Sequence, residues 1–185
     1  MMKKISKNTF GSSFDDKLTI FLIFLLIVIL TLSHIIKFGN IQSSSMAPTL
    51  KVHDLAIANR MAYKSAEPQR GDIIFFQYDT EVFGKRVIGI PGDTITFENG
   101  YVYINGEKLD EPYLDLDVKT DCTDSFLVPP DTVFVMGDNR EHSYDSRYWE
   151  NPYVSYNRIY GKCFFVFRFS LLWEMMEHNE NCSKK

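Results

Sequence analysis

Apolar residues follow two different patterns along this chain of 185 residues. Residues 18–36 are apolar apart from two threonines, one serine and one histidine. At a helical rise of about 1.5 Å per residue, this segment approaches the roughly 30 Å thickness of a membrane's hydrocarbon core. A cleaved signal peptide would show an A-x-A arrangement after the apolar run, and the sequence SHIIKF at its end has none. The pattern therefore predicts an uncleaved transmembrane anchor over residues 18–36.

The remainder of the chain has short apolar stretches rich in β-branched and aromatic residues. Turn sequences such as Pro91-Gly92-Asp93 and Asn105-Gly106 separate them. Many short strands with Gly, Pro and Asn between them indicate an all-β domain. The expected strands are residues 54–58, 72–78, 86–90, 94–97, 101–104, 132–136 and 162–169. The apolar stretch 163–173 is expected to be a final core strand and not a second membrane span, because it is too short to cross.

Three regions are therefore expected: a polar tail (1–17), the anchor (18–36) and a globular domain (37–185). Four lysines precede the anchor, and only Lys37 follows it closely. Basic residues favour the cytoplasmic side of a membrane span. We expect a single-pass protein of the cell membrane, with a cytoplasmic tail and the globular domain on the outer face.

Charge and cysteine content narrow the possible partners. The formal net charge is −4, and the part after the anchor is more acidic still, which argues against nucleic acid as a partner. Cys122, Cys163 and Cys182 are too far apart for a zinc site of the usual spacing. An outer compartment permits one disulfide, whose pair the sequence does not select, and one thiol would then stay free.

A serine and a lysine are the first candidates for chemistry. Ser45 follows the anchor in the run Ile41 to Leu50, and a serine hydroxyl needs a base to become a nucleophile. None of the four histidines has a recognisable partner pattern. A lysine can be the base if an apolar pocket lowers its pKa from about 10.4. Lys85 lies among apolar residues, although a serine-rich turn and a snorkelling lysine are the commoner interpretations of each residue alone.

Alternation along a strand would place Lys85 and Arg86 on opposite faces. One of them can then face a core-side cleft while the other faces solvent. The position of Lys85 within its motif favours it as the base, and composition alone does not separate the two.

A third motif occupies residues 136–149, a dense polar loop in a β-rich domain. Asp145 and Arg147 are two positions apart, so they could form an ion pair on one side of an extended strand. Ser143 could accept a hydrogen bond from a lysine amine and orient its lone pair. A solvated turn is the alternative interpretation.

Four stretches, in this order, resemble the signature boxes of bacterial type I signal peptidases, the serine–lysine leader peptidases of family S26. They are SSSMAPT from Ser43, RGDI from Arg70, KRVIGIPGD from Lys85, and GDNR from Gly137 continuing to Arg147. The resemblance implies a compact, mostly antiparallel β domain, with an apolar surface that touches the membrane. Ser44 stands where the family often has glycine, and Glu141-His142 where it commonly has Asp-Asn. Neither departure removes a catalytic group.

The resemblance also implies roles for individual residues. Ser45 would be the nucleophile and Lys85 the general base. The backbone N–H of Ser45 and the hydroxyl of Ser43 would form the oxyanion hole. Ser143 would orient Lys85, while Asp145 and Arg147 would brace the site. Shallow pockets for small substrate side chains would be lined by Ile41, Met46, Leu50 and Phe83. The aromatic residues 164–169 and Trp173 are candidates for the membrane-touching surface, and equally for the core.

The predicted function is a membrane-bound serine endopeptidase that removes signal peptides from exported preproteins. Cleavage would follow small residues at −3 and −1 and proceed through an acyl-enzyme. The substrate would bind as an extended strand near residues 39–43 and 83–85. No metal or organic cofactor is expected, so chelators should have no effect.

Three alternatives stay open. One is a peptidase with the same dyad that is dedicated to a single exported, pilus or conjugation substrate. Another is a catalytically silent, membrane-tethered scaffold that binds exported chains. The third, a soluble self-cleaving repressor of the Ser–Lys type, is opposed by the anchor.

Overall fold

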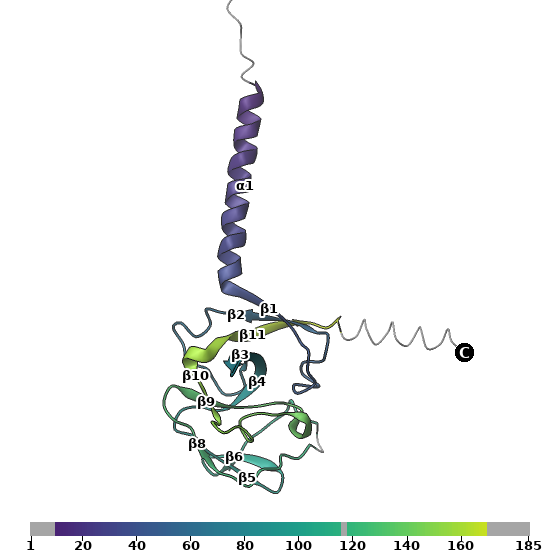
Figure 1. Cartoon of the computed structure of the whole chain (residues 1–185), viewed down its shortest axis with the longest axis vertical. Coiled ribbons are helices and arrows are strands. Elements are labelled where there is room, and N and C mark those ends of the chain that lie inside the picture. The colour runs from purple at the N-terminus through teal and green to yellow at the C-terminus, as the bar shows by residue number, and fades with distance from the viewer. Residues whose placement is uncertain (1–9, 116–117, 170–185) are drawn as a thin grey trace, which may run out of the picture. The chain divides into compact units, whose positions relative to one another are not determined.

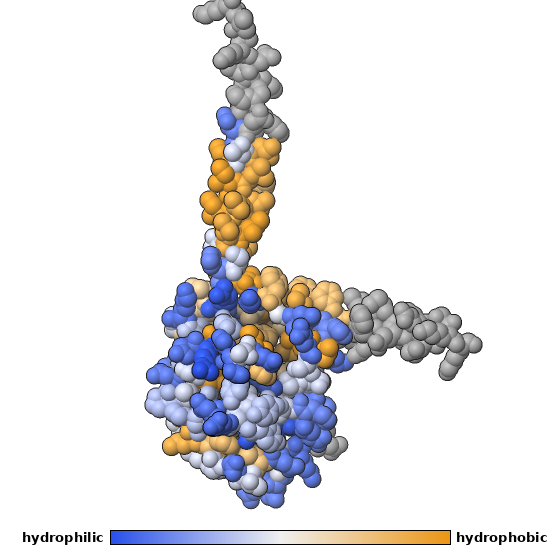
Figure 2. Space-filling model, in the orientation of Figure 1, coloured by the Kyte–Doolittle hydropathy of each residue, from blue (hydrophilic) through white to orange (hydrophobic). Residues whose placement is uncertain are grey.

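The computed structural model describes residues 10–115 and 118–169. It divides into two compact units, Met1–Ile36 and Lys37–Lys185. Helix α1 (Phe10–Ile35) forms the first, and it begins eight residues before the predicted anchor (Figure 1). Residues Asp16–Ile35 are long and apolar enough to cross a membrane. Their apolar side chains are exposed, as the orange surface of α1 in Figure 2 shows.

The second unit holds a seven-stranded and a four-stranded sheet. From β2 to β10 every neighbouring pair in the larger sheet is antiparallel, as are all three pairs of the smaller one. The larger sheet contains, in spatial order, β1 (Ile36–Asn40), β2 (Leu55–Asn59), β11 (Ile159–Phe167), β3 (Ile73–Tyr78), β4 (Glu81–Gly89), β9 (Thr132–Met136) and β10 (Tyr153–Ser155). The smaller sheet contains β7 (Glu107–Lys108), β6 (Tyr101–Ile104), β5 (Thr94–Glu98) and β8 (Phe126–Leu127). Two short 3-10 helices, η1 (Arg140–His142) and η2 (Tyr156–Arg158), complete the described elements.

Strand β9 and residues 85–89 of β4 are buried on both faces, which explains the nearly continuous apolar sequence of β9. Val133 and Val135 of β9 pack in one core cluster with Ile74, whereas Phe134 and Met136 pack in a second cluster with Ile95. Adjacent β4 residues divide in the same way, Val87 into the first cluster and Ile88 into the second. These two strands therefore join the two cores; β4 contains Lys85, and β9 leads directly into the polar loop that begins at Gly137.

The predicted fold class, a mainly antiparallel β domain after one apolar helix, is confirmed. All seven predicted strands are present, but β4 begins at Glu81 and not at residue 86. Strands β1, β7, β8 and β10 were not predicted.

The expectation for the last apolar stretch was only partly right. Residues Ile159–Phe167 do form a strand, β11, between β2 and β3. Phe164, Phe165 and Phe167 are nevertheless 57%, 49% and 46% exposed, so these side chains are surface and not core. Trp173 and Cys182 lie outside the described residues, and Cys122 and Cys163 are free thiols.

Candidate active site

Ser45 lies in the loop 41–54 between β1 and β2, within residues 43–50, here called the serine turn. The turn is closed by backbone bonds from Ala47 N–H to the Ser44 carbonyl (3.0 Å) and from Leu50 N–H to the Met46 carbonyl (2.8 Å). The Met46 and Leu50 side chains are buried and anchor the turn in the domain, while Ser45 stays half-buried. Its Oγ is 3.2 Å from Oγ of the exposed Ser43. The turn thus presents two neighbouring hydroxyls at the surface.

Lys85 is placed on β4 opposite Ile74, and its side chain is 1% exposed. Its Nζ donates a hydrogen bond to Ser143 Oγ at 2.8 Å. Burial removes water from the ammonium form and lowers the pKa of Lys85 to about 8, although the nearby Asp145 carboxylate partly opposes this shift. A fraction of the amine is therefore neutral near physiological pH and can accept a proton.

Gly137 connects the serine turn to the lysine and its partner. A Cβ at this position would lie 2.2 Å from Ser143 Oγ and 2.3 Å from the Ser45 carbonyl oxygen, so only glycine fits. The N–H of the nearby Asn139 donates to the same Ser45 carbonyl at 3.1 Å. Segments almost a hundred residues apart in sequence thus meet at one backbone position.

The ion pair predicted between Asp145 and Arg147 is present and buried. Arg147 Nε and Nη2 donate to the two Asp145 carboxylate oxygens at 2.8 and 2.9 Å. Asp145 Oδ2 also accepts the Gly137 N–H at 2.9 Å, and Arg147 Nη2 donates to the Arg140 carbonyl at 2.8 Å. The pair therefore holds the loop around Ser143 from both ends.

The expectation that one of Lys85 and Arg86 faces solvent was wrong. Arg86 is 8% exposed and donates from Nε and Nη2 to the two oxygens of Asp138, at 2.8 and 2.6 Å. Asp138 also accepts from the Thr49 hydroxyl, which ties it to the serine turn. Sequence reasoning missed this pair because it assigned one face of β4 to solvent. The sequence did contain a signal for this pair. Asp138 stands in the polar loop 136–149, and a buried arginine that donates two hydrogen bonds needs a carboxylate to accept them.

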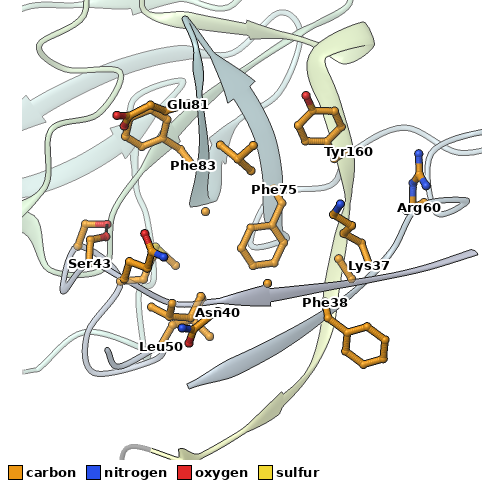
Figure 3. A pocket seen from close by; sticks show the side chains of 18 residues that line it. Lys37, Phe38, Asn40, Ser43, Leu50, Arg60, Phe75, Glu81, Phe83 and Tyr160 are labelled. Carbon is orange, nitrogen blue, oxygen red and sulfur yellow. Dashed lines mark hydrogen bonds between the residues drawn. The ribbon is translucent and has the colours of Figure 1, made fainter. Parts of the chain in front are cut away.

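A groove of about 870 Å³ opens beside the serine turn. All four predicted pocket residues line it, together with both candidate hydroxyl residues: Ile41, Met46, Leu50, Phe83, Ser43 and Ser45. The ring of Phe75, which was not predicted, lies in the middle of the groove (Figure 3). It packs against Gly84, where a Cβ would come within 2.8 Å of the ring.

Two strand edges border the groove without a strand partner in the described part of the chain. Strand β1 has a neighbour on one side only. Residues 81–84 of β4 pair with β3, whereas the pairing of β4 with β9 begins at Arg86. Both edges line the groove, so their backbone groups are available to an extended peptide.

The predicted site residues thus gather in one place, with one contact missing. Ser43, Ser45 and the four pocket residues surround the groove, while Lys85 is buried next to Gly84, which lines it. Among the described residues, no hydrogen bond joins Ser45 Oγ to Lys85 Nζ. Catalytic hydrogen bonds are often long in a free enzyme and tighten only with substrate.

A surface serine near a buried, partly neutral lysine, beside a groove for an extended chain, is typical of peptidases that use a Ser–Lys pair. The comparison with family models agrees with this class: residues 16–169 match the model for signal peptidase, peptidase S26. The chain belongs to this family, as the signature boxes indicated.

Curated relatives support the same assignment. The chain is 37% identical over 155 residues to signal peptidase I of Bacillus caldolyticus, which covers 75% of this chain and 84% of that protein. It is 38% identical over 135 residues to the probable signal peptidase I-2 of Synechocystis, covering 69% of this chain and 61% of that one. The chain thus spans less than two thirds of the Synechocystis protein.

Among solved structures, the crystal structure of signal peptidase I from Enterococcus faecalis is similar to the chain. The sequence identity is 31% and the TM-score 0.46, with 52% of this chain and 97% of that chain covered.

Proposed function

We propose that this chain is a membrane-bound serine endopeptidase that removes signal peptides from exported preproteins after small residues at −3 and −1. The observation that carries the proposal is a groove ending at Ser45 beside a buried Lys85 whose pKa is about 8. Membership of the signal peptidase family supports the substrate class. The proposed partners are preproteins and the lipid bilayer.

In the proposed mechanism, Ser45 Oγ attacks the carbonyl carbon of residue −1 while its proton passes to neutral Lys85 Nζ. The tetrahedral intermediate expels the amine of the mature chain, which takes the proton from Lys85 as the C–N bond breaks. Water activated by Lys85 then hydrolyses the acyl-enzyme. Ser143 accepts one N–H of the amine and so directs its lone pair. Ser45 Oγ lies 3.2 Å from Ser43 Oγ in the free protein, and for attack the Ser45 hydroxyl must point its proton at Lys85 Nζ.

The developing oxyanion would be held by the Ser45 N–H and the Ser43 hydroxyl. The Ser45 N–H donates to no acceptor in the described part of the chain, and the Ser43 hydroxyl lies beside the nucleophile. Removing one such donor typically costs about 10²- to 10³-fold in rate. Both groups belong to a turn anchored by buried side chains, so they are preorganised for this task.

Substrate would enter the groove as an extended strand between the free edges of β1 and β4. Backbone hydrogen bonds would provide affinity, and alternate side chains would point into the groove. The Phe75 ring at its centre would limit the size of those side chains. This arrangement explains why small residues would be required at −1 and −3.

Helix α1 would anchor the protein with its N-terminus in the cytoplasm and the catalytic unit on the outer face. The excess of lysines before the helix supports this orientation. The active site would then work on the side of the membrane where signal peptides emerge.

The decisive experiment incubates the detergent-solubilised full chain with a preprotein that carries alanine at −3 and −1. We expect cleavage after the −1 alanine by the wild type and loss of at least about 10³-fold in kcat/KM for Ser45→Ala and for Lys85→Ala. Lys119→Ala, which removes an exposed lysine far along the chain from the site, is the matched control. Unchanged cleavage in either dyad variant would refute the mechanism.

The same assay separates the alternatives. Cleavage of several unrelated preproteins supports a general signal peptidase, and cleavage of only one supports a dedicated enzyme. No cleavage by folded wild type, on any preprotein of the panel, would favour the silent scaffold.

A further inference from the structure

A segment attached to the four-stranded sheet contacts the polar loop of residues 137–147, here called the catalytic loop. Residues 111–113, here called the buttress, follow strand β7. The chain just before it is fixed to β6 by the bond from Leu109 N–H to the Val102 carbonyl (2.9 Å). Farther along, Thr120 N–H donates to the Gly100 carbonyl in the turn before β6 (2.9 Å). The smaller sheet therefore holds this part of the chain on both sides of the buttress.

Glu111 is the polar centre of the buttress. Its carboxylate accepts hydrogen bonds from both terminal nitrogens of Arg140, that from Nη1 at 3.1 Å, and from the Tyr113 hydroxyl at 2.6 Å. Arg140 is 1% exposed, and its Nη1 also donates to Thr120 Oγ1 at 2.7 Å. A guanidinium buried this deeply needs a paired carboxylate, and Glu111 is the carboxylate that Arg140 contacts.

Two arginines connect the buttress to Gly137 and Asp138, two successive residues of the catalytic loop. Arg140 Nε donates to the Gly137 carbonyl at 3.1 Å. The Arg86 guanidinium lies 3.8 Å from the centre of the Tyr113 ring, and the same guanidinium forms the ion pair with Asp138. Gly137 is the position that separates Ser143 Oγ from the Ser45 carbonyl. A shift here would change the spacing of nucleophile, base and base partner together.

We propose that Glu111 is a positioning residue for the reaction: through Arg140 it fixes the Gly137 carbonyl, and so the spacing between Ser45 and the Lys85–Ser143 pair. Its effect on catalysis depends on the proposed function. Its effect on the environment of Lys85 does not. The machinery that orients the site then includes the buttress.

The experiment compares Glu111→Gln with Glu107→Gln, an exposed glutamate on β7, in the full-length protein in detergent. For Glu111→Gln we expect kcat to fall about tenfold or more and KM to stay within about twofold, because alignment and not substrate binding is lost. Glu107→Gln should match the wild type in both constants.

A second readout does not depend on turnover. The pKa of Lys85 is measured by NMR on ¹³C-labelled lysine, with Lys85→Ala to identify its signal. Loosening Gly137 admits water to the amine, so in Glu111→Gln this pKa should rise by about one unit or more toward its ordinary value. If wild type cleaves no preprotein, the proposed function fails while this shift still tests the inference.

The inference is overturned if folded Glu111→Gln keeps the wild-type kcat and the wild-type Lys85 pKa. It is also overturned if activity falls only in proportion to the unfolded fraction. Should Glu111→Gln not fold, Tyr113→Phe decides, since it removes one bond to Glu111 and keeps the ring on Arg86. That variant should lower kcat about threefold and raise the Lys85 pKa, and an unchanged kcat and pKa would refute the proposal.

Discussion

At the scale of single residues, the site depends on what surrounds Lys85. Its side chain is buried, and among the described residues its amine hydrogen-bonds only Ser143, so desolvation outweighs the favourable field of Asp145. Asp145 is itself bound by Arg147, which reduces its pull on the lysine proton. A lysine with a looser environment would remain charged and could not act as a base.

This environment predicts the pH dependence of cleavage. The base works only when neutral, and burial lowers the pKa of Lys85 to about 8, so kcat/KM should rise with pH and level off above about pH 8. Activity should be lost on acidification, as the amine becomes protonated. The measurement is kcat/KM from pH 6 to 10 on a preprotein without titrating groups near the cleavage site. A midpoint near 6.5 would instead indicate a histidine base.

At the scale of elements, the sequence predicts strands that have a clear apolar pattern and misses those that depend on distant partners. Strand β9, with the sequence TVFVM, was predicted with its correct bounds. The start of β4 contains Glu81 and Gly84 and has weak strand character by itself, but it pairs with the strongly apolar β3. Strand β1 directly follows the apolar helix and was counted partly with it.

The same limit applies to the site. Ser45, Lys85 and the Asp145–Arg147 pair lie in local motifs that can be recognised in sequence. The bond of Arg140 to Glu111 spans 29 positions, and that of Arg86 to Asp138 spans 52, and no periodicity encodes either. In the sequence, Phe75 resembles any core residue of an apolar strand. Its place in the groove depends on Gly84 of the neighbouring strand, which leaves room for the ring.

The packing of β3 against β4 in the groove can be tested by Gly84→Ala. The new Cβ would lie 2.8 Å from the Phe75 ring and push it toward the substrate path, so KM should rise about tenfold. Phe75→Leu in the same protein shortens the obstructing side chain and should restore most of the affinity. Steady-state kinetics of the single and double variants provide the check. If Gly84→Ala and the double variant have the same KM, the Phe75 ring does not limit the groove.

At the scale of the whole molecule, two units of different character are joined at residue 36. The first is an apolar helix without a core, and the second is a β domain with two cores and exposed phenylalanines on β11. Such exposed aromatic residues are costly in water and favourable at a membrane interface. The composition of both units therefore agrees with the proposed location of the protein at a membrane.

The proposed orientation predicts which end of the protein an added protease can reach. The cells are stripped of their wall or outer membrane, and the cell membrane stays intact. A tag placed after residue 185 should be digested from outside, whereas a tag before residue 1 should survive until detergent is added. Immunoblots of the two tagged proteins give the answer. Digestion of the N-terminal tag in intact cells would reverse the orientation.

The free edges of β1 and β4 have a consequence for how such an enzyme could serve many substrates. A strand edge binds peptide N–H and C=O groups, which every polypeptide carries whatever its side chains. Affinity gained in this way is common to all sequences, so discrimination must come from refusing entry to bulky residues. Under the proposed function, one groove could then accept many unrelated leaders, and their sequences could vary widely without a change in the enzyme.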